Sequence, residues 1–517
     1  MEKNPHLHTA ECSCCGGNLH SNDISRRKFV GVTGKSFLGS VAFSGLTWSA
    51  LSAIAPVQDF DLKRKAVVVK PILTYAVPSP GKQTSWREWG GIQTEKQAEE
   101  EKSKISGELG ALMKRSDFPL EILPVSSVKS DAALDGVSDI ASADVILIYA
   151  AGGSSKIFDR LNKSGKNILF FLRHRSGPVY LWYEIVSPRY LRSHTDKLAV
   201  SGITEHDVVV DNQDEILWKL RALCGLKNTM NSRILAIGGA GGWSQPKAPD
   251  YARDKFRLDI VTINYDDLGE LIKQAKSDRQ AIAGAAKRAA EYLSDTSLKL
   301  ETKREYVENC FLLEDVFVRL MEKFECRALT INNCMSTIMP MSETTACLTL
   351  SLLNDAGYLA FCESDFVVIP AGILLAHISG KPVFLNDPTY PHDGIITLAH
   401  CTAPRRMDGL KREPARLLTH FESDYGAAPK VEMTPGQVLT NIIPDFEFRK
   451  NVGFTGKVHD NPFLDICRSQ IDVSFTFEST VLAEKMPGFH WISGYGDYLK
   501  EYGYALRKTG IEFEKLS

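Results

Sequence analysis

Short runs of consecutive apolar residues alternate along the chain with longer segments whose apolar positions recur every three or four residues. The first three runs lie at 66–69, 144–150 and 167–172, and the segment 95–113 has helical periodicity. Runs of this length are typical of strands buried on both faces, and intervening helices are typical of parallel sheets. The pattern predicts an N-terminal α/β domain over residues 60–228.

The same alternation begins again with an apolar run at 233–237, followed by a helical pattern over 278–324 and another run at 328–332. We therefore expect a second Rossmann-like parallel-sheet domain over residues 231–405. Beyond it, short alternating segments separated by turn residues predict a β-rich C-terminal domain over 406–517. A chain of 517 residues agrees with several domains, because single cores stop growing near roughly 250–300 residues.

Composition narrows the range of functions. The chain is 44% hydrophobic and 24% charged, as in ordinary folded proteins, and it has 61 basic and 63 acidic residues. Without an excess of positive charge, binding to nucleic acid through phosphate neutralisation is not expected. We expect a protein that acts on a small molecule.

The N-terminal segment has the layout of an export signal. Ser-Arg-Arg-Lys-Phe at 25–29 opens a weakly hydrophobic stretch, rich in small residues, that continues to Ala55. This layout is typical of twin-arginine signals. We predict a signal peptide over residues 1–55, passage through the twin-arginine translocase and a periplasmic or other extracytoplasmic location. The alternatives are a retained membrane anchor and a core helix.

Two further patterns have structural interpretations. A glycine cluster at 238–242 follows a strand, and Asp259 lies twenty residues after Gly239, as in dinucleotide sites. Pro246 and Pro249 stand where the phosphate-binding helix would begin, which favours a structural or substrate-facing loop over a nucleotide site. Eight cysteines beyond the signal have no paired short spacings, which predicts buried thiols.

Three apolar runs end in residues that bind metals. The runs 358–362, 382–385 and 395–399 lead into Glu363, Asp387 and His400, respectively. In a parallel sheet these ends would share one edge, where open α/β folds bind their ligands. Two carboxylates and an imidazole suit the harder divalent metals. The alternative is that the carboxylates cap the following helices.

The same region resembles a known superfamily. Ser-Leu-Leu-Asn-Asp-x-Gly at 351–357, followed by Cys-Glu-Ser-Asp at 362–365, is similar to the metal-binding core of the L-fucose isomerase and L-arabinose isomerase superfamily. The resemblance implies that Glu363 and Asp387, 24 residues apart, bind a divalent ion, commonly manganese, and act as acid and base. His490, in His-Trp-Ile-Ser-Gly, matches a further ligand. His400 resembles a histidine of the arabinose members.

This resemblance covers roughly residues 231–505. It implies a fucose-isomerase-like fold, a homo-oligomer and an isomerase that interconverts open-chain aldoses and ketoses through an enediol. Asp365 either orients Glu363 or caps a helix predicted to begin at Phe366. Family members typically act in the cytoplasm. An exported lyase or hydrolase, or a sugar-binding protein on the same scaffold, therefore stays open.

Overall fold

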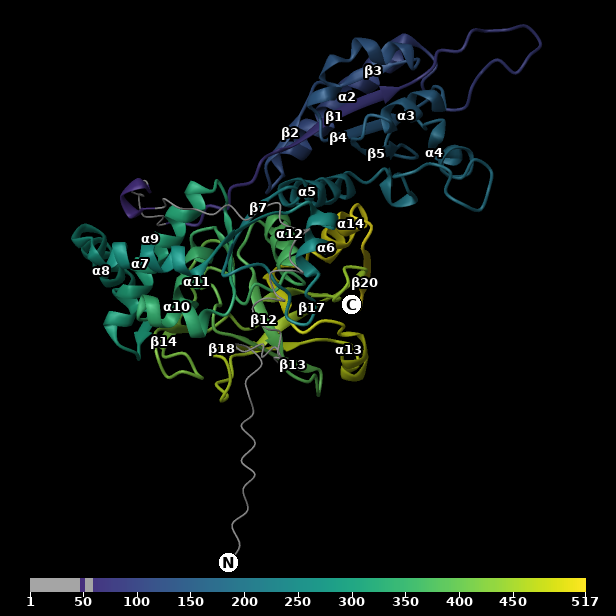
Figure 1. Ribbon diagram of the computed structural model, residues 1–517. Helices are drawn as coiled ribbons and strands as arrows, with labels where there is room; N and C mark the ends of the chain where they lie inside the picture. Colours follow the sequence, from purple (N-terminus) through teal and green to yellow (C-terminus); the bar gives the residue numbers. More distant parts are fainter. Residues whose placement is uncertain (1–46, 52–58) are drawn as a thin grey trace, which may run out of the picture. The chain divides into compact units, whose positions relative to one another are not determined.

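The computed structural model describes residues 47–51 and 59–517, which form two compact units (Figure 1). One unit consists of Arg64–Asn228 and Lys500–Lys508, and the other contains Thr229–Leu499 and Thr509–Ser517. Most of the predicted export signal, including its two arginines, lies outside the described residues.

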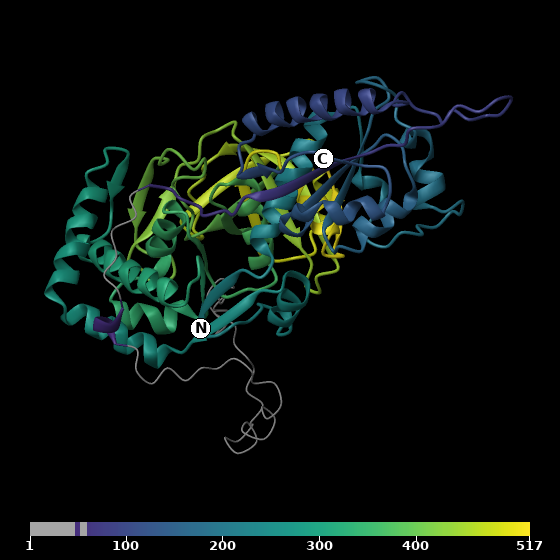
Figure 2. The ribbon, with the colours of Figure 1, turned by 90° about the horizontal axis from the view of Figure 1, so that it is seen from above.

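The Arg64–Asn228 unit is built on a parallel sheet with strand order β2-β1-β4-β5-β6, and β3 pairs with the far end of β1. Its strands are β1 (Val67–Thr74), β2 (Leu120–Ile122), β3 (Ser126–Val128), β4 (Val145–Ala150), β5 (Asn167–Leu172) and β6 (Val208–Val210). Its helices are α2 (Glu95–Lys114), α3 (Ser155–Asn162), α4 (Trp182–Ile185), α5 (Gln213–Thr229) and α14 (Leu499–Arg507). Figure 2 shows α2 alongside β1. Strands β4 and β5 are almost entirely buried, as expected for the centre of a covered parallel sheet.

The second unit contains a smaller parallel sheet, with strand order β11-β10-β7-β8. Its strands are β7 (Arg233–Ile237), β8 (Asp259–Ile263), β10 (Ala328–Ile331) and β11 (Leu359–Phe361). The helices around it are α6 (Ala248–Phe256), α7 (Tyr265–Ser277), α8 (Arg279–Leu293), α9 (Arg304–Lys323), α10 (Cys334–Ser342), α11 (Ala346–Asp355) and α12 (Ile369–Ser379). The helical pattern over 278–324 is thus two helices, separated by a short strand.

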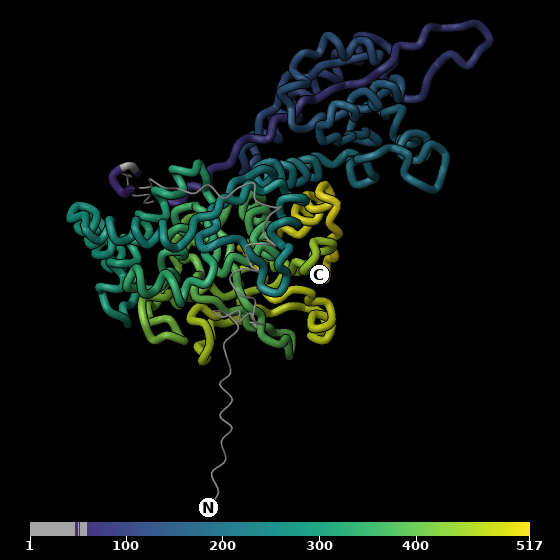
Figure 3. Tube along the Cα trace, in the orientation of Figure 1, coloured from purple at the N-terminus to yellow at the C-terminus, as the bar shows by residue number. Residues whose placement is uncertain are grey.

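The rest of this unit is an antiparallel β-barrel. Six strands follow the order β16-β19-β12-β13-β18-β17, pairing of β16 with β17 closes the ring, and β20 adds to β17 in parallel. The elements are β12 (Phe384–Pro388), β13 (Ile395–His400), β16 (Val438–Pro444), β17 (Lys450–Asp460), β18 (Ser469–Ser474), α13 (Ser479–Lys485), β19 (Trp491–Tyr495) and β20 (Glu512–Lys515). In Figure 3 the green chain of β12 and the yellow chain of β19 belong to this barrel. A three-stranded sheet of β15 (Ala428–Val431), β14 (Ala415–Leu418) and β9 (Leu298–Leu300) completes the unit.

The fold prediction is confirmed at the level of class: the chain is a mixed α/β protein with parallel-sheet cores and a C-terminal antiparallel barrel. One expectation is wrong. Strands β12 and β13 pair antiparallel with each other and belong to the barrel, whereas β11 belongs to the parallel sheet. The three runs that end in Glu363, Asp387 and His400 therefore do not share one parallel-sheet edge.

Three observations concern the remaining sequence predictions. Within the predicted export signal, Trp48 of the short helix η1 (Trp48–Ala50) is buried, and its Nε1–H donates to Asp278 Oδ2 at 2.8 Å. The eight described cysteines are all buried free thiols, as predicted. Among the described residues, no helix combines the length and apolar character that crossing a bilayer requires.

Candidate metal centre

Glu363 lies in a tight turn directly after β11. Both Glu363 and the next residue, Ser364, have left-handed backbone conformations, with φ of 65° and 52°. Such conformations are uncommon outside glycine and persist where neighbouring groups hold them. Here the Ser364 N–H donates to Thr330 Oγ1 at 3.1 Å, and Ser364 Oγ–H donates to the carbonyl of Gly239 at 2.7 Å. The turn thus fixes the direction of the Glu363 side chain.

The barrel supplies the other predicted residues through its strand pairing. Strand β12 lies between β13 and β19, so Asp387 pairs with Ala399 on one side, next to His400. On the other side Asn386 pairs with Trp491, which places His490 beside Asp387. Antiparallel pairing therefore gathers these side chains from three adjacent strands.

These side chains meet Glu363 between the parallel sheet and the barrel. His490 Nε2 lies 3.2 Å from Glu363 Oε2 and 3.2 Å from Asp387 Oδ1, while His400 Nε2 lies 3.6 Å from Glu363 Oε1. The side chains of His490, Glu363 and Asp387 are 0%, 9% and 18% exposed. The structure thus brings together all four residues that the sequence analysis singled out as metal ligands.

The facing atoms of these residues lack hydrogen bonds. Glu363 Oε2, Asp387 Oδ1, His400 Nε2 and His490 Nε2 are buried, and none has a hydrogen-bond partner among the described residues. Neighbouring ligands of a divalent ion stand about 3 Å apart when metal–ligand distances are about 2.1 Å. The two 3.2 Å separations at His490 agree with that spacing. The donor set therefore fits a divalent cation.

Asp365 contacts both His490 and the turn that precedes α12. Its Oδ2 accepts a hydrogen bond from His490 Nδ1 at 2.7 Å, so it orients His490 rather than Glu363. Helix α12 begins at Ile369, later than predicted, and in the turn before it Asp365 Oδ1 accepts the Val367 N–H at 3.0 Å, a contact of the capping type. A carboxylate behind a ligating imidazole fixes its tautomer and raises its basicity. The Glu-x-Asp spacing of residues 363–365 indicated that Asp365 supports a ligand. The sequence did not show that this ligand is His490, because the two residues are distant in sequence.

The carboxylates create a strongly negative environment at both histidines. Burial lowers the pKa of His490, but Asp365, Asp387 and Glu363 outweigh it and hold that pKa well above its usual value. Burial likewise opposes the shift at His400, whose pKa the neighbouring Glu363 and Asp387 raise to about 9. Both rings therefore lie where a positive charge is stabilised.

The glycine-rich loop and an aromatic pair adjoin this centre. The Trp243 N–H donates to Asp365 Oδ1 at 3.3 Å, and Gly241 forms a backbone bridge with Asp365. The Trp243 ring stacks on Phe489 at 5.1 Å and meets His490 edge-on at 5.9 Å. The glycine-rich loop thus packs against the candidate metal centre.

The structure also reveals ligand-type groups that the sequence analysis missed. In two groups all ligand atoms lie within 4.8 Å of one another: Cys362, Glu363 and His400 form one, and Cys347, Cys401 and His420 form the other. Because the cysteines are scattered along the sequence, their spacing did not indicate either group. The available signal was that Cys362 and Cys401 directly adjoin the predicted ligands Glu363 and His400.

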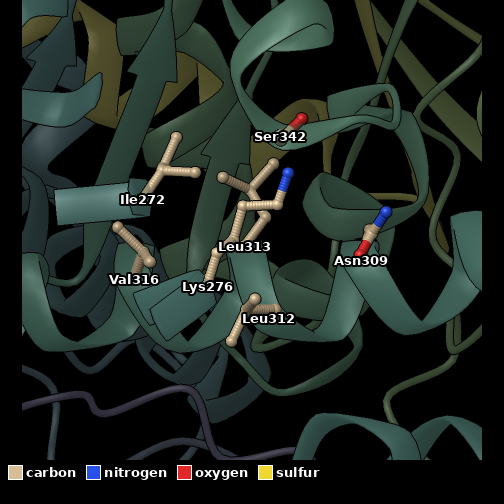
Figure 4. Close-up of a pocket in the computed structure, with 7 residues that line it drawn as sticks. All are labelled: Ile272, Lys276, Asn309, Leu312, Leu313, Val316 and Ser342. Atoms are coloured by element: carbon tan, nitrogen blue, oxygen red, sulfur yellow. The ribbon is translucent and has the colours of Figure 1, made fainter. Parts of the chain in front are cut away.

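A separate cavity between α7, α9 and α10 has a different character. Figure 4 shows its lining, which is mostly aliphatic: Ile272, Lys276, Asn309, Leu312, Leu313, Val316 and Ser342. Lys276 pairs with Glu343 at 2.8 Å. This lining offers no cluster of acid–base or metal-ligating groups, so the candidate site is the one around His490.

Comparison with known proteins adds no family assignment. No protein-family model matches the chain, and no curated protein matches it. The functional argument therefore depends on the residues and their geometry.

Proposed function

We propose that this chain is a metal-dependent isomerase that interconverts an open-chain aldose and its ketose. The observation that carries the proposal is the convergence of Glu363 and Asp387 on His490, with buried ligand atoms that make no hydrogen bonds to other described residues. The similarity of 351–357 and 362–365 to the L-fucose and L-arabinose isomerase superfamily agrees with it.

The reaction needs two groups that move protons. One carboxylate removes the proton from C2 of the aldose, which gives an enediol, and a proton then returns to C1 while the hydroxyl hydrogen passes from O2 to O1. Glu363 and Asp387 flank His490 and are suited to these transfers. A divalent ion, manganese by the resemblance, would supply positive charge beside the two substrate oxygens.

His490 and His400 have supporting roles in this proposal. His490 would hold the ion, because Asp365 at 2.7 Å keeps the hydrogen on Nδ1 and directs the Nε2 lone pair toward the acids. His400, 3.6 Å from Glu363, would add a fourth donor or orient that carboxylate.

The burial of the acids favours a small substrate over a glycan. A polysaccharide needs an open cleft along its catalytic acids, whereas the Glu363 and Asp387 side chains are only 9% and 18% exposed. An exported lyase or hydrolase, or a binding protein, is therefore the second candidate.

We also propose that the protein is exported by the twin-arginine route. Export would determine the compartment in which the protein encounters its sugar.

The test combines metal loading with a screen of free sugars. Protein stripped with a chelator is reloaded with Mn²⁺ and incubated with aldoses and ketoses in deuterated water. Interconversion with deuterium incorporated at C1 or C2 is expected, because proton transfer through an enediol exchanges with solvent. Glu363→Gln removes the proton acceptor and one charged ligand, so it should abolish turnover and weaken Mn²⁺ binding.

The matched control is Asp393→Asn, which neutralises a carboxylate that is 92% exposed and should keep full activity. Full activity in Glu363→Gln would refute the mechanism. A parent protein that binds Mn²⁺ but neither converts nor exchanges any free sugar would favour the lyase, hydrolase or binding alternative.

A further inference from the structure

A second cluster of ligand-type side chains lies beside the acidic centre. The ligand atoms of Cys347, Cys401 and His420 all lie within 4.8 Å of one another, and all three residues are buried. Cys347 is in the first turn of α11, Cys401 directly follows β13, and His420 follows β14. Three elements distant in sequence thus bring two thiols and an imidazole together.

A third thiol completes the surroundings. Cys467, in the loop before β18, packs with Cys347 and Cys401 in one small buried cluster. These residues line a cavity that extends to the acidic centre, and the lining as a whole is rich in sulfur: Cys334, Met335, Cys347, Cys362, Glu363, His400, Cys401, Thr402, His420 and Cys467. Five cysteines on one cavity indicate a chemistry different from that of the carboxylates.

The contacts of Cys401 favour its thiolate, the form that binds metals. The backbone N–H of Arg468 points to Cys401 Sγ at 3.5 Å. The His420 ring is oriented by a hydrogen bond between Nδ1 and Ser423 Oγ at 3.2 Å. Outer partners of this kind are typical of ligating histidines.

We propose that Cys347, Cys401 and His420 form a second metal site, which takes a thiophilic divalent cation such as zinc, with Cys467 as the candidate fourth ligand. Two thiolates and an imidazole prefer zinc, in tetrahedral coordination, over the harder ions that suit Glu363 and Asp387. Binding releases the protons of the ligating thiols and creates metal–sulfur bonds without any redox change. This inference does not depend on the proposed isomerase activity.

Cobalt provides the direct test, because Co²⁺ bound to thiolates shows a ligand-to-metal charge-transfer absorption that oxygen ligands do not give. Full-length protein is reduced, stripped of metal and titrated with Co²⁺. The parent should develop this absorption up to one equivalent and lose it when Zn²⁺ is added. Cys347→Ser and Cys401→Ser should each reduce the absorption and weaken Zn²⁺ binding at least tenfold.

Two controls separate this site from its neighbours. Cys326→Ser alters a buried thiol of the same unit outside the cluster and should leave the absorption unchanged. Glu363→Gln should also retain it, even where that variant loses isomerase activity, so failure of the isomerase proposal would not count against the thiolate site.

The proposal is overturned if the parent shows no thiolate-to-cobalt absorption, or if the Cys347→Ser, Cys401→Ser double variant keeps it. Detection of a Cys347–Cys401 disulfide in protein isolated without reductant would also overturn it, since the pair would then serve as a redox couple or a covalent link. If Cys401→Ser fails to fold, His420→Gln provides the same test. This variant should give a weaker and narrower thiolate-to-cobalt absorption band.

Discussion

Replacing Asp365 with asparagine tests how His490 is held. Asp365 Oδ2 faces His490 Nδ1 at 2.7 Å, and its Oδ1 accepts the backbone N–H groups of Val367 at 3.0 Å and Trp243 at 3.3 Å. Asparagine has a single acceptor oxygen. If that oxygen stays with the two backbone donors, the amide NH₂ faces Nδ1 and forces the other tautomer, which places a hydrogen on Nε2.

A protonated Nε2 offers no lone pair to a metal, so the variant should bind Mn²⁺ about 10- to 100-fold more weakly, or about 1.4–2.7 kcal/mol. If the amide oxygen instead turns toward His490, the Val367 and Trp243 N–H groups lose a buried acceptor. That arrangement costs about 1–3 kcal/mol of folding free energy. The first arrangement changes metal affinity, and the second changes the stability of the metal-free protein.

The assay is therefore calorimetric titration of metal-free protein with Mn²⁺, alongside urea unfolding without metal. Asp393→Asn, at an exposed carboxylate, is the control and should match the parent in both measurements. Parent Mn²⁺ affinity together with parent stability in Asp365→Asn would refute the idea that this carboxylate positions His490.

Three further changes have definite expected results. Gly238→Ala should destabilise the protein by about 1–3 kcal/mol in thermal unfolding, because φ is 76° there and a Cβ would lie 2.3 Å from the Tyr265 ring. Burial raises the pKa of Glu314 to about 7 from 4.5, so the folded state binds more protons than the unfolded chain between these values and stability should fall as pH rises through that window. Glu314→Gln should flatten this part of the unfolding profile. A reporter fused to residues 1–58 should leave the cytoplasm with the native signal and stay inside when Arg26 and Arg27 are both lysine.

The strands of the parallel sheets could be predicted from sequence because their apolar runs are continuous and glycine-rich turns follow them. Residues 144–150 and 233–237 were predicted as strands that correspond to β4 and β7 almost residue for residue. The break between α8 and α9 was missed, because residues 294–303 contain neither proline nor glycine. Nothing local marks a short strand that depends on pairing with β14.

The direction of β12 could not be predicted for a different reason. The apolar residues of Phe384–Pro388 are buried in the barrel, and a run buried in a barrel looks the same as one in a parallel sheet. Helix α12 before it completes a strand–helix–strand pattern, which favours a parallel neighbour. The decisive information is pairing with β19, whose residues lie more than a hundred positions away.

The four predicted residues nevertheless lie together, and their burial limits what these ligand-type side chains can do. Each buried polar atom without a hydrogen bond costs about 1–3 kcal/mol, and four such atoms face one another here. A positive charge among these atoms, carried by a protonated ring or by a metal ion, lowers that cost. A proton on His490 Nε2 has one direction in which to donate, whereas Glu363 and Asp387 both lie 3.2 Å from that atom. His490 Nε2, Glu363 Oε2 and Asp387 Oδ1 can all bind one divalent ion at the same time. This is the physical reason for expecting a metal ion in this position rather than an ion pair between His490 and one carboxylate.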